Sequence, residues 1–178
     1  MKILTISRLV PVKRINLLVE VLNNITIELE WVHFGGGELK NELKNNIKLL
    51  PTNISVDLKG EWKNKEMMNF IKNNHFDVFI NISESEGLPV SIMEVISFGI
   101  PVFATNAGGT NEIVSSRTGK LFDVNLNKMN LSNSLNNFFN SKYNEENFRL
   151  KVREYWQENF DANNNYKKFI DRFLLIDK

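Results

Sequence analysis

Two glutamates, Glu86 and Glu94, stand eight positions apart in the stretch SESEGLPVSIMEVISFGIPVFATNAGGTNEI, residues 83–113. A carboxylate can accept two hydrogen bonds, as the vicinal hydroxyls of a ribose would offer. The residues on either side of Glu94 are apolar, and a carboxylate in such a segment needs a partner. The spacing therefore indicates a polar ligand held by carboxylates, with an ordinary solvated helix position as the alternative for Glu94.

The turn Glu86-Gly87-Leu88-Pro89 stands where a strand gives way to a helix. Gly87 permits a tight turn and lets a ligand approach the backbone closely, and Pro89 suits the first turn of a helix. The free N–H groups of such a helix start favour an anion such as a diphosphate. Glu86 is expected to project over the same pocket.

Two cations, Arg8 and Lys13, follow the first expected strand. An arginine fork and a lysine point charge both suit phosphate oxygens, although the pair could equally be ordinary surface cations. Gly35-Gly36-Gly37 follows the second strand and either lies beside the ligand or only turns the chain. Because the carboxyl ends of parallel strands meet at one edge, we expect these loops to form one polar rim.

Short apolar runs rich in β-branched residues alternate with helical patterns along most of the chain. This alternation predicts a doubly wound, Rossmann-like α/β domain, with a parallel sheet covered by helices on both faces. The apolar stripes that begin at Leu17, Leu39 and Met67 predict three of the helices. The expected strands are 2–6, 31–34, 54–58, 77–82, 101–104 and, as a short sixth, 120–122.

The tail from Asn125 onward contains helical patterns only. Its aromatic and aliphatic residues are expected to be buried as the helices pack on the domain. These positions are Phe138, Phe139, Phe148, Val152, Tyr155, Trp156, Phe160, Tyr166, Phe169, Ile170 and Phe173.

The composition excludes several classes of function. With 22 basic and 21 acidic residues the net charge is +1, so no basic field indicates nucleic acid. The absence of cysteine excludes disulfides and thiolate chemistry, and the two histidines, His33 and His75, are interpreted as structural, so no metal site is proposed. No signal peptide or membrane span is recognised, which favours a cytoplasmic protein, with the inner face of the membrane as an option.

Two stretches in this order resemble the C-terminal, donor-binding half of the glycosyl transferases group 1 family, retaining enzymes with the GT-B fold. The first, ISRLVPVKRINLLVEVL, is similar to the family's opening strand with its arginine and lysine. The second, SESEGLPVSIMEVISFGIPVFATNAGGTNEIV, is similar to its signature of two glutamates with seven residues between them. The resemblance extends over nearly the whole chain, so 1–178 is interpreted as a single nucleotide-sugar-binding domain.

The resemblance implies a role for each matching residue. Glu86 would contact the sugar hydroxyls, Glu94 the ribose diol, and Arg8 and Lys13 the diphosphate, which makes Glu86, Arg8 and Lys13 the catalytic candidates. The N–H groups of Gly87 and Leu88, beside Pro89, would add to the diphosphate site. The loop from Glu61 through Trp62 to Lys63 would lie beside the base. The donor would be a UDP- or GDP-linked sugar, bound as substrate without a further cofactor.

The chain also departs from the family pattern. Ser7 stands where glycine is common and Val95 where alanine is common, and the first strand begins at the second residue, so the N-terminal acceptor domain is expected to be absent. The expected partners are that domain, the donor, and a glycan or lipid-linked acceptor, with membrane contact through the missing half. Two alternatives stay open: a nucleotide-sugar-binding module without chemistry, and a nucleotide-sugar epimerase.

Overall fold

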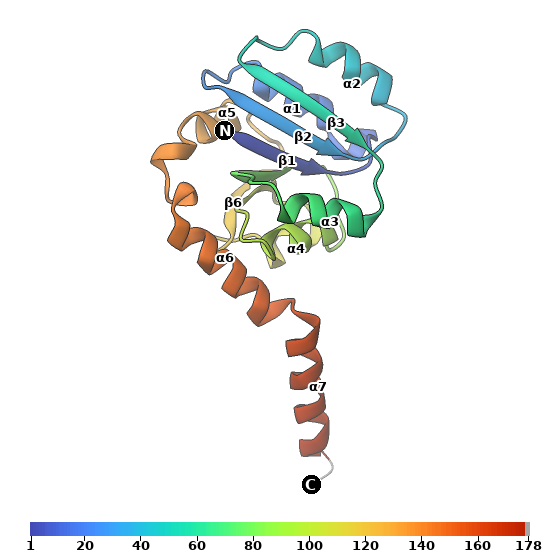
Figure 1. Ribbon diagram of the computed structural model, residues 1–178, viewed down its shortest axis with the longest axis vertical. Coiled ribbons are helices and arrows are strands. Elements are labelled where there is room, and N and C mark those ends of the chain that lie inside the picture. Colours follow the sequence, from blue (N-terminus) through green and yellow to red (C-terminus); the bar gives the residue numbers. More distant parts are fainter. Residues whose placement is uncertain (177–178) are drawn as a thin grey trace.

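Six parallel strands form one sheet in the order β3-β2-β1-β4-β5-β6 (Figure 1). The computed structural model describes the backbone of residues 1–176 and the side chains of residues 1–171. The predicted parallel sheet is confirmed, and each expected strand lies within about two residues of its predicted bounds. The strands are β1 (Lys2–Ile6), β2 (Leu29–Phe34), β3 (Ile54–Gly60), β4 (Val78–Asn81), β5 (Val102–Thr105) and β6 (Gly119–Phe122).

The order of the strands reverses next to β1, which pairs with β2 on one side and with β4 on the other. In open parallel sheets a crevice forms at such a switch point, outside the carboxyl ends of the strands. The loops that follow β1, β2 and β4 are therefore brought to the place where a ligand would bind.

Helices cover both faces of this sheet (Figure 1). One face carries α1 (Ile15–Leu22), α2 (Lys40–Ile47) and α5 (Lys128–Asn136), and the other carries α3 (Asn64–Lys72), α4 (Val90–Ile96) and α6 (Glu146–Asn159). Short 3-10 turns connect several elements, and α7 (Ala162–Ile176) follows α6. The turns are η1 (Pro11–Lys13), η2 (Gly108–Glu112), η3 (Phe138–Asn140) and η4 (Lys142–Asn144).

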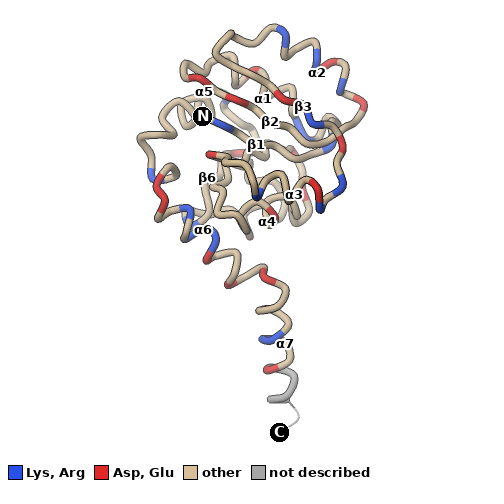
Figure 2. The backbone as a smooth tube through the Cα atoms, viewed as in Figure 1, with Lys and Arg blue, Asp and Glu red and all other residues tan. Residues whose placement is uncertain are grey.

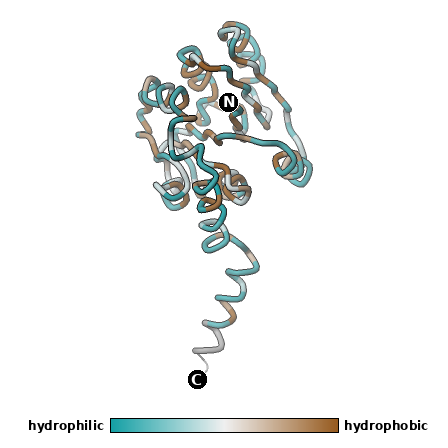
Figure 3. The backbone as a smooth tube through the Cα atoms, turned by 60° about the vertical axis from the view of Figure 1, so that its left-hand side comes forward, coloured by the Kyte–Doolittle hydropathy of each residue, from teal (hydrophilic) through white to brown (hydrophobic). Residues whose placement is uncertain are grey.

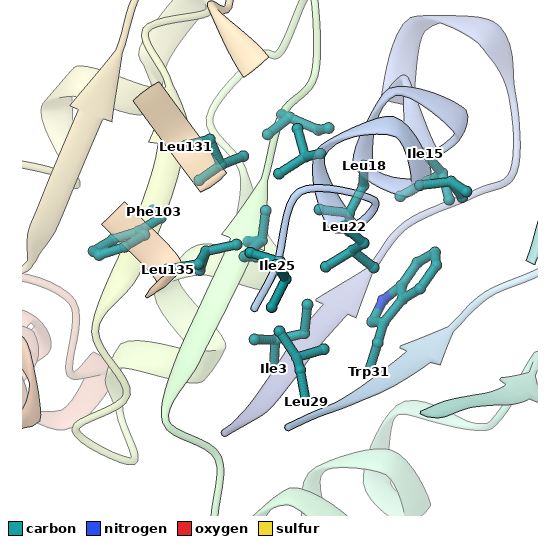
Figure 4. Packing of buried hydrophobic residues seen from close by; sticks show 14 of the residues in the cluster. Ile3, Ile15, Leu18, Leu22, Ile25, Leu29, Trp31, Phe103, Leu131 and Leu135 are labelled. Carbon is teal, nitrogen blue, oxygen red and sulfur yellow. The ribbon is translucent and has the colours of Figure 1, made fainter. Parts of the chain in front are cut away.

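The α1 face shows how the sequence pattern becomes a core (Figure 4). Ile15, Leu18 and Leu22 recur at helical spacing, and all three are buried against Ile3 and Trp31 of the sheet. Each such side chain stabilises the fold by roughly 1.5–3 kcal/mol when it is fully buried. This packing fixes the direction in which β1 and β2 reach the rim.

A line of polar side chains lies buried within that apolar face. Trp31 Nε1–H donates to Thr5 Oγ1 at 2.8 Å, and the same hydroxyl lies 2.8 Å from His33 Nδ1. Burial lowers the pKa of His33 to about 4. His33 Nε2 has no hydrogen-bond partner within the described residues. His33 is thus a neutral core side chain, as the structural interpretation predicted.

The C-terminal helices correct part of the predicted core. Phe138, Phe148 and Val152 are buried as expected, and the neighbouring positions Tyr155, Trp156, Phe160 and Ile170 are partly buried. The prediction was wrong for three residues: Phe139 is 48% exposed, Tyr166 67% and Phe169 62%. The side chain of Phe173 lies outside the described residues.

Two of these errors, Tyr166 and Phe169, have a shared physical cause, because both lie on α7, which projects away from the body of the domain (Figure 1). Figure 3 shows apolar segments gathered in the body, whereas α7 is mostly hydrophilic with isolated apolar positions. A helical pattern of apolar residues records a face suited to packing, but it does not say that the chain supplies the surface to pack on.

Charges of both signs alternate along the surface helices, for example on α2 and α6 (Figure 2). This mixture agrees with the net charge of +1. Among the described residues, no helix is both long and apolar enough to cross a membrane.

Candidate donor-binding site

A cavity of about 520 Å³ opens at the carboxyl ends of β1 and β2, between these strands and the starts of α3 and α4. Its lining comes from segments far apart in the sequence, namely the ends of β1 and β2 with the loops that follow them, the loop after β3, and helices α3 and α4. Its polar or aromatic lining residues include Ser7, Arg8, Glu61, Trp62, Asn64 and Glu94. The cavity is large enough for a ligand of nucleotide size.

Glycine forms the floor of this cavity because the loops after β1 and β2 touch one another. Gly35 has φ +137°, and a Cβ at this position would lie 1.8 Å from the carbonyl oxygen of Ser7. The Ser7 N–H donates to the carbonyl of Phe34 at 3.0 Å, which holds the two strand ends together. Glycine is therefore required at position 35 by this backbone contact, and Gly35 and Gly36 line the cavity.

Arg8 is the cation that reaches into the cavity. Its side chain is exposed, and in the described part of the chain no hydrogen bond or ion pair holds its guanidinium. All five N–H donors are thus available to a ligand, which suits phosphate oxygens.

Glu94 lies on α4 and faces the cavity, while its neighbours Ile92, Val95 and Ile96 point into the core. Asn64, the first residue of α3, donates its side-chain N–H to Glu94 Oε1 at 2.6 Å. The partner that a carboxylate in this segment requires is therefore an amide from another helix. This bond also orients the carboxylate at the wall of the cavity.

Trp62 forms the aromatic wall. Its ring packs edge to face on Phe34 and Phe70, with ring centroids 5.2 and 5.6 Å apart, and its indole N–H donates to the Lys59 carbonyl at 3.0 Å. The side chain is still 40% exposed, so part of one aromatic surface is free for a flat ligand group.

Lys13 and Glu86 form an ion pair after the ends of β1 and β4, outside the cavity lining. Lys13 Nζ lies 2.6 Å from Glu86 Oε1, and the side chains are 22% and 10% exposed. Asn81 Nδ2 donates to the same oxygen at 3.1 Å. Burial alone would raise the pKa of Glu86, but hydrogen bonds from Lys13, Ser83 and Asn81 and the charge of Lys13 outweigh it and lower that pKa.

The turn after Glu86 is exposed and held from one side. The Gly109 N–H donates to the Gly87 carbonyl at 3.1 Å, whereas the N–H groups of Gly87 and Leu88 have no hydrogen-bond acceptor among the described residues. The prediction that Pro89 lies in the first turn of α4 was wrong by one position. Pro89 is the N-cap residue immediately before Val90. Its backbone is extended, with φ −74° and ψ 101°, because the chain enters the helix only at the next residue.

All of the predicted site residues except Lys63 fall into three groups. Arg8, Trp62 and Glu94 line the cavity, and Lys13 and Glu86 form the adjacent pair. Gly87 and Leu88 lie exposed on the turn between them, with Pro89 buried behind it. Lys63 is exposed and is not part of the cavity lining.

Two residues of this site were missed by the sequence reasoning, namely Asn64 and Asn81, which hold Glu94 and Glu86. Asn81 carried a usable signal, because a polar residue stands near the end of an otherwise apolar strand pattern. Asn64 carried none, because asparagine is frequent throughout the chain.

A second hollow in the molecule is larger than the cavity at the switch point. A hollow of about 700 Å³, lined by Lys72, His75, Arg149 and Arg153, opens beside the start of β4. Its most buried cation is already occupied, since Arg149 donates to the carbonyls of Phe76 and Asp77 at 2.9 and 3.3 Å. The smaller cavity at the switch point presents the free cation and the oriented carboxylate.

Comparison with known proteins places the chain in a family. The sequence profile described as "Glycosyl transferases group 1" matches residues 1–159. The chain therefore belongs to the glycosyl transferases group 1 family, as the two sequence motifs suggested.

Curated relatives are longer than this chain. The chain is 33% identical over 109 residues to the UDP-Gal:alpha-D-GlcNAc-diphosphoundecaprenol alpha-1,3-galactosyltransferase of Escherichia coli, covering 58% of this chain and 26% of that protein. It is 32% identical over 184 residues to Protein CapJ of Staphylococcus aureus, covering 95% and 45%. The chain thus spans between about a quarter and a half of the length of these relatives.

Solved structures agree on the fold. The apo form of the lipopolysaccharide outer core galactosyltransferase WaaB superposes with a TM-score of 0.81 and 18% identity, covering 97% of this chain and 48% of that one. The complex of Anabaena Alr3699/HepE with UDP and glucose has a TM-score of 0.79 and 20% identity, with coverage of 97% and 47%. At these identities the likeness concerns the fold, and the chain corresponds to about one half of each of those chains.

Proposed function

We propose that this chain is the donor-binding domain of a retaining glycosyltransferase, which moves a sugar from a nucleoside diphosphate-sugar to a glycan or lipid-linked acceptor. One observation carries the proposal: the free cation Arg8, the aromatic wall Trp62 and the oriented carboxylate Glu94 share one cavity at the switch point. Diphosphate, base and ribose diol are the three chemical groups that such a set would recognise. The resemblance of the site motifs to those of the family supports the same assignment.

In this proposal the nucleotide lies across the rim. Glu94, held by Asn64, accepts hydrogen bonds from the ribose diol, and Trp62 lies beside the base. Arg8 contacts the diphosphate, to which the free N–H groups of Gly87 and Leu88 add donors. The sugar then extends toward Glu86, on the side of the adjacent ion pair.

The chemistry follows from where charge develops. As the glycosidic bond breaks, negative charge grows on the leaving diphosphate, and Arg8 and Lys13 stabilise it without a metal ion. Glu86 and Glu94 serve sugar and ribose, so they are not the pair of carboxylates that flank the bond in glycoside hydrolases. The acceptor and any group that activates it belong to a second domain outside this chain, and we expect the chain alone to transfer no sugar.

Ligand binding to the chain itself tests the proposal. Titration calorimetry with UDP, GDP and their hexose conjugates should show saturable binding for one base, with the free nucleoside bound much more weakly. If none of these ligands binds, the chain is not a donor-binding domain. Binding together with transfer by this chain alone would overturn the expectation that a second domain is required.

Replacing Arg8 by alanine should weaken nucleoside diphosphate binding by about 2 kcal/mol, or roughly thirtyfold, because a charge-assisted contact is lost. Binding of the nucleoside should change little, since it lacks the phosphates. Arg153→Ala on α6 removes the same charge away from the cavity and serves as the control. Equal losses for nucleotide and nucleoside would show that Arg8 does not serve the phosphates.

Replacing Glu94 by glutamine should weaken nucleoside and nucleotide alike by about 1.5 kcal/mol, or roughly tenfold, because the ribose diol loses a charged acceptor. The substitution keeps the volume of the side chain and an oxygen for Asn64. A 2′,3′-dideoxynucleoside diphosphate provides the control, since it has no diol to lose. If Glu94→Gln reduces the affinity for this analogue by the same factor as the affinity for the natural nucleotide, Glu94 supports the cavity wall and does not hold the ribose.

A further inference from the structure

Lys13 is paired with Glu86 and is also the proposed partner of the donor diphosphate. The Lys13 ammonium lies 2.6 Å from Glu86 Oε1, and both side chains are largely buried. The proposed function asks the same ammonium to contact the diphosphate of the donor. An ammonium in close contact with a carboxylate is already partly neutralised and has fewer N–H donors to offer a phosphate.

The backbone on both sides of this pair is fixed. Arg14, next to Lys13, donates to the carbonyls of Ile82 and Val124 at 2.7 Å each, and the Glu84 N–H donates to Val12 at 2.8 Å. These bonds tie the turn after β1 to the loops after β4 and β6. Any change of partner by Lys13 is therefore a rotation of its flexible side chain and needs no movement of a loop.

Glu86 has a second donor that does not depend on Lys13. Asn81 Nδ2 donates to Glu86 Oε1 at 3.1 Å, and Asn81 Oδ1 accepts the N–H of Ser83 at 3.1 Å, which anchors the amide at the end of β4. If Lys13 departs, Asn81 still orients the carboxylate. The Glu86 carboxylate would then be partly buried without the positive charge of Lys13. This costs free energy unless another hydrogen-bond donor takes the place of Lys13.

We propose that Glu86 competes with the donor diphosphate for Lys13, so that donor binding transfers the ammonium from carboxylate to phosphate and leaves Glu86 to the sugar hydroxyls. This inference rests on the proposed function and adds a rule of selection to it. A nucleotide that carries a sugar replaces what Glu86 loses, whereas a nucleotide without the sugar leaves the carboxylate uncompensated. The pair thus favours the nucleotide-sugar over the sugar-free nucleotide that the reaction releases.

Glu86→Gln provides the test in the full 178-residue chain. UDP and UDP-glucose are the probes, or GDP and GDP-mannose if the guanine nucleotide binds the unmodified chain better. Because Lys13 is released in the variant, the sugar-free nucleotide should bind about two- to fivefold more tightly, the upper part of the range measured for single ion pairs. The nucleotide-sugar should gain less or lose affinity, so the preference for it should shrink.

Two controls separate exchange of Lys13 from simple charge repulsion. Glu84→Gln removes a carboxylate from the same loop, where no ion pair or hydrogen bond joins its side chain to Lys13 in the described structure, and it should leave the preference unchanged. In a Lys13→Met background, Glu86→Gln should give at most a small part of its gain. An equal gain in both backgrounds, or from Glu84→Gln, shows general electrostatics and overturns the proposal.

The remaining outcomes are also decisive. If Glu86→Gln does not fold, Glu86→Asp keeps the charge but shortens the side chain, and it should tighten binding of the sugar-free nucleotide in the same direction. An unchanged affinity in a folded variant overturns the exchange while the proposed function stands. If the unmodified chain binds no nucleotide, the proposed function fails and the exchange fails with it.

Discussion

Replacing Gly108 by alanine should lower the free energy of unfolding by about 3–4 kcal/mol, because the added methyl group meets both an unfavourable backbone conformation and a steric clash. Gly108 has φ +52°, which costs a residue with a Cβ roughly 1–2 kcal/mol. The added Cβ would also lie 1.8 Å from the carbonyl oxygen of Glu86, so the loop after β4 would have to move. Overpacking of this kind adds roughly 1–3 kcal/mol. Chemical denaturation followed by fluorescence measures the loss.

Two other glycines separate these contributions. Gly60 has φ +71° but open space around its Cβ position, so Gly60→Ala reports backbone strain without a clash. Gly87 lies next to the loop that contains Gly108, and a Cβ added to Gly87 would meet no atom within 4 Å. Gly87→Ala should therefore be nearly neutral. A Gly108→Ala loss no greater than that of Gly60→Ala would mean that the contact with Glu86 does not hold the loop.

Acidification from pH 6.5 to pH 4 should remove about 3 kcal/mol of stability through His33 alone. Burial lowers the pKa of His33 to about 4, whereas the unfolded chain has the ordinary value near 6.5. Between these values the unfolded state binds one more proton than the folded state, so stability rises with pH across this window. The contribution is fully present above pH 6.5, falls through the window and is constant below about pH 4.

The measurement is the free energy of unfolding at several pH values for the unmodified chain and for His33→Leu. The variant loses the bond to Thr5 and will be less stable, but its stability should depend less on pH within the window. The matched control is His75→Leu, which removes the other histidine. The His75 side chain is 69% exposed and lies 3.0 Å from Asp77. If His33→Leu keeps the full pH dependence, His33 is accessible to protons in the folded state.

The fold was predictable because periodicity and turn residues agree over most of the chain. The strand that precedes Glu86 and the helix that contains Glu94 were located from alternation and from Gly87 and Pro89. The tail was less predictable, because Phe138 and Phe148 are buried whereas Tyr166 and Phe169 are largely exposed. Sequence periodicity reports what a helix can bury, whereas burial itself depends on which elements lie nearby.

The site was predictable in its members and less so in its connections. Arg8, Trp62 and Glu94 come together because the sheet order brings their loops to one edge. That Lys13 already pairs with Glu86 depends on side-chain reach between positions 73 residues apart, which no local pattern records. The same holds for Asn64, whose partner Glu94 is 30 residues away.

The central place of β1 also has a consequence for how the chain folds during synthesis. β1 pairs with β2, with Ile3 opposite Trp31, and its other edge pairs with β4, with Ile3 opposite Val78, so its second partner is synthesised much later than its first. At synthesis rates of roughly 5–20 residues per second, this apolar edge stays unpaired for several seconds after β2 has emerged. Unpaired edges invite pairing with another chain. The exposure of the strand that positions Arg8 therefore depends on the timing of translation, and protection by chaperones would matter during that interval.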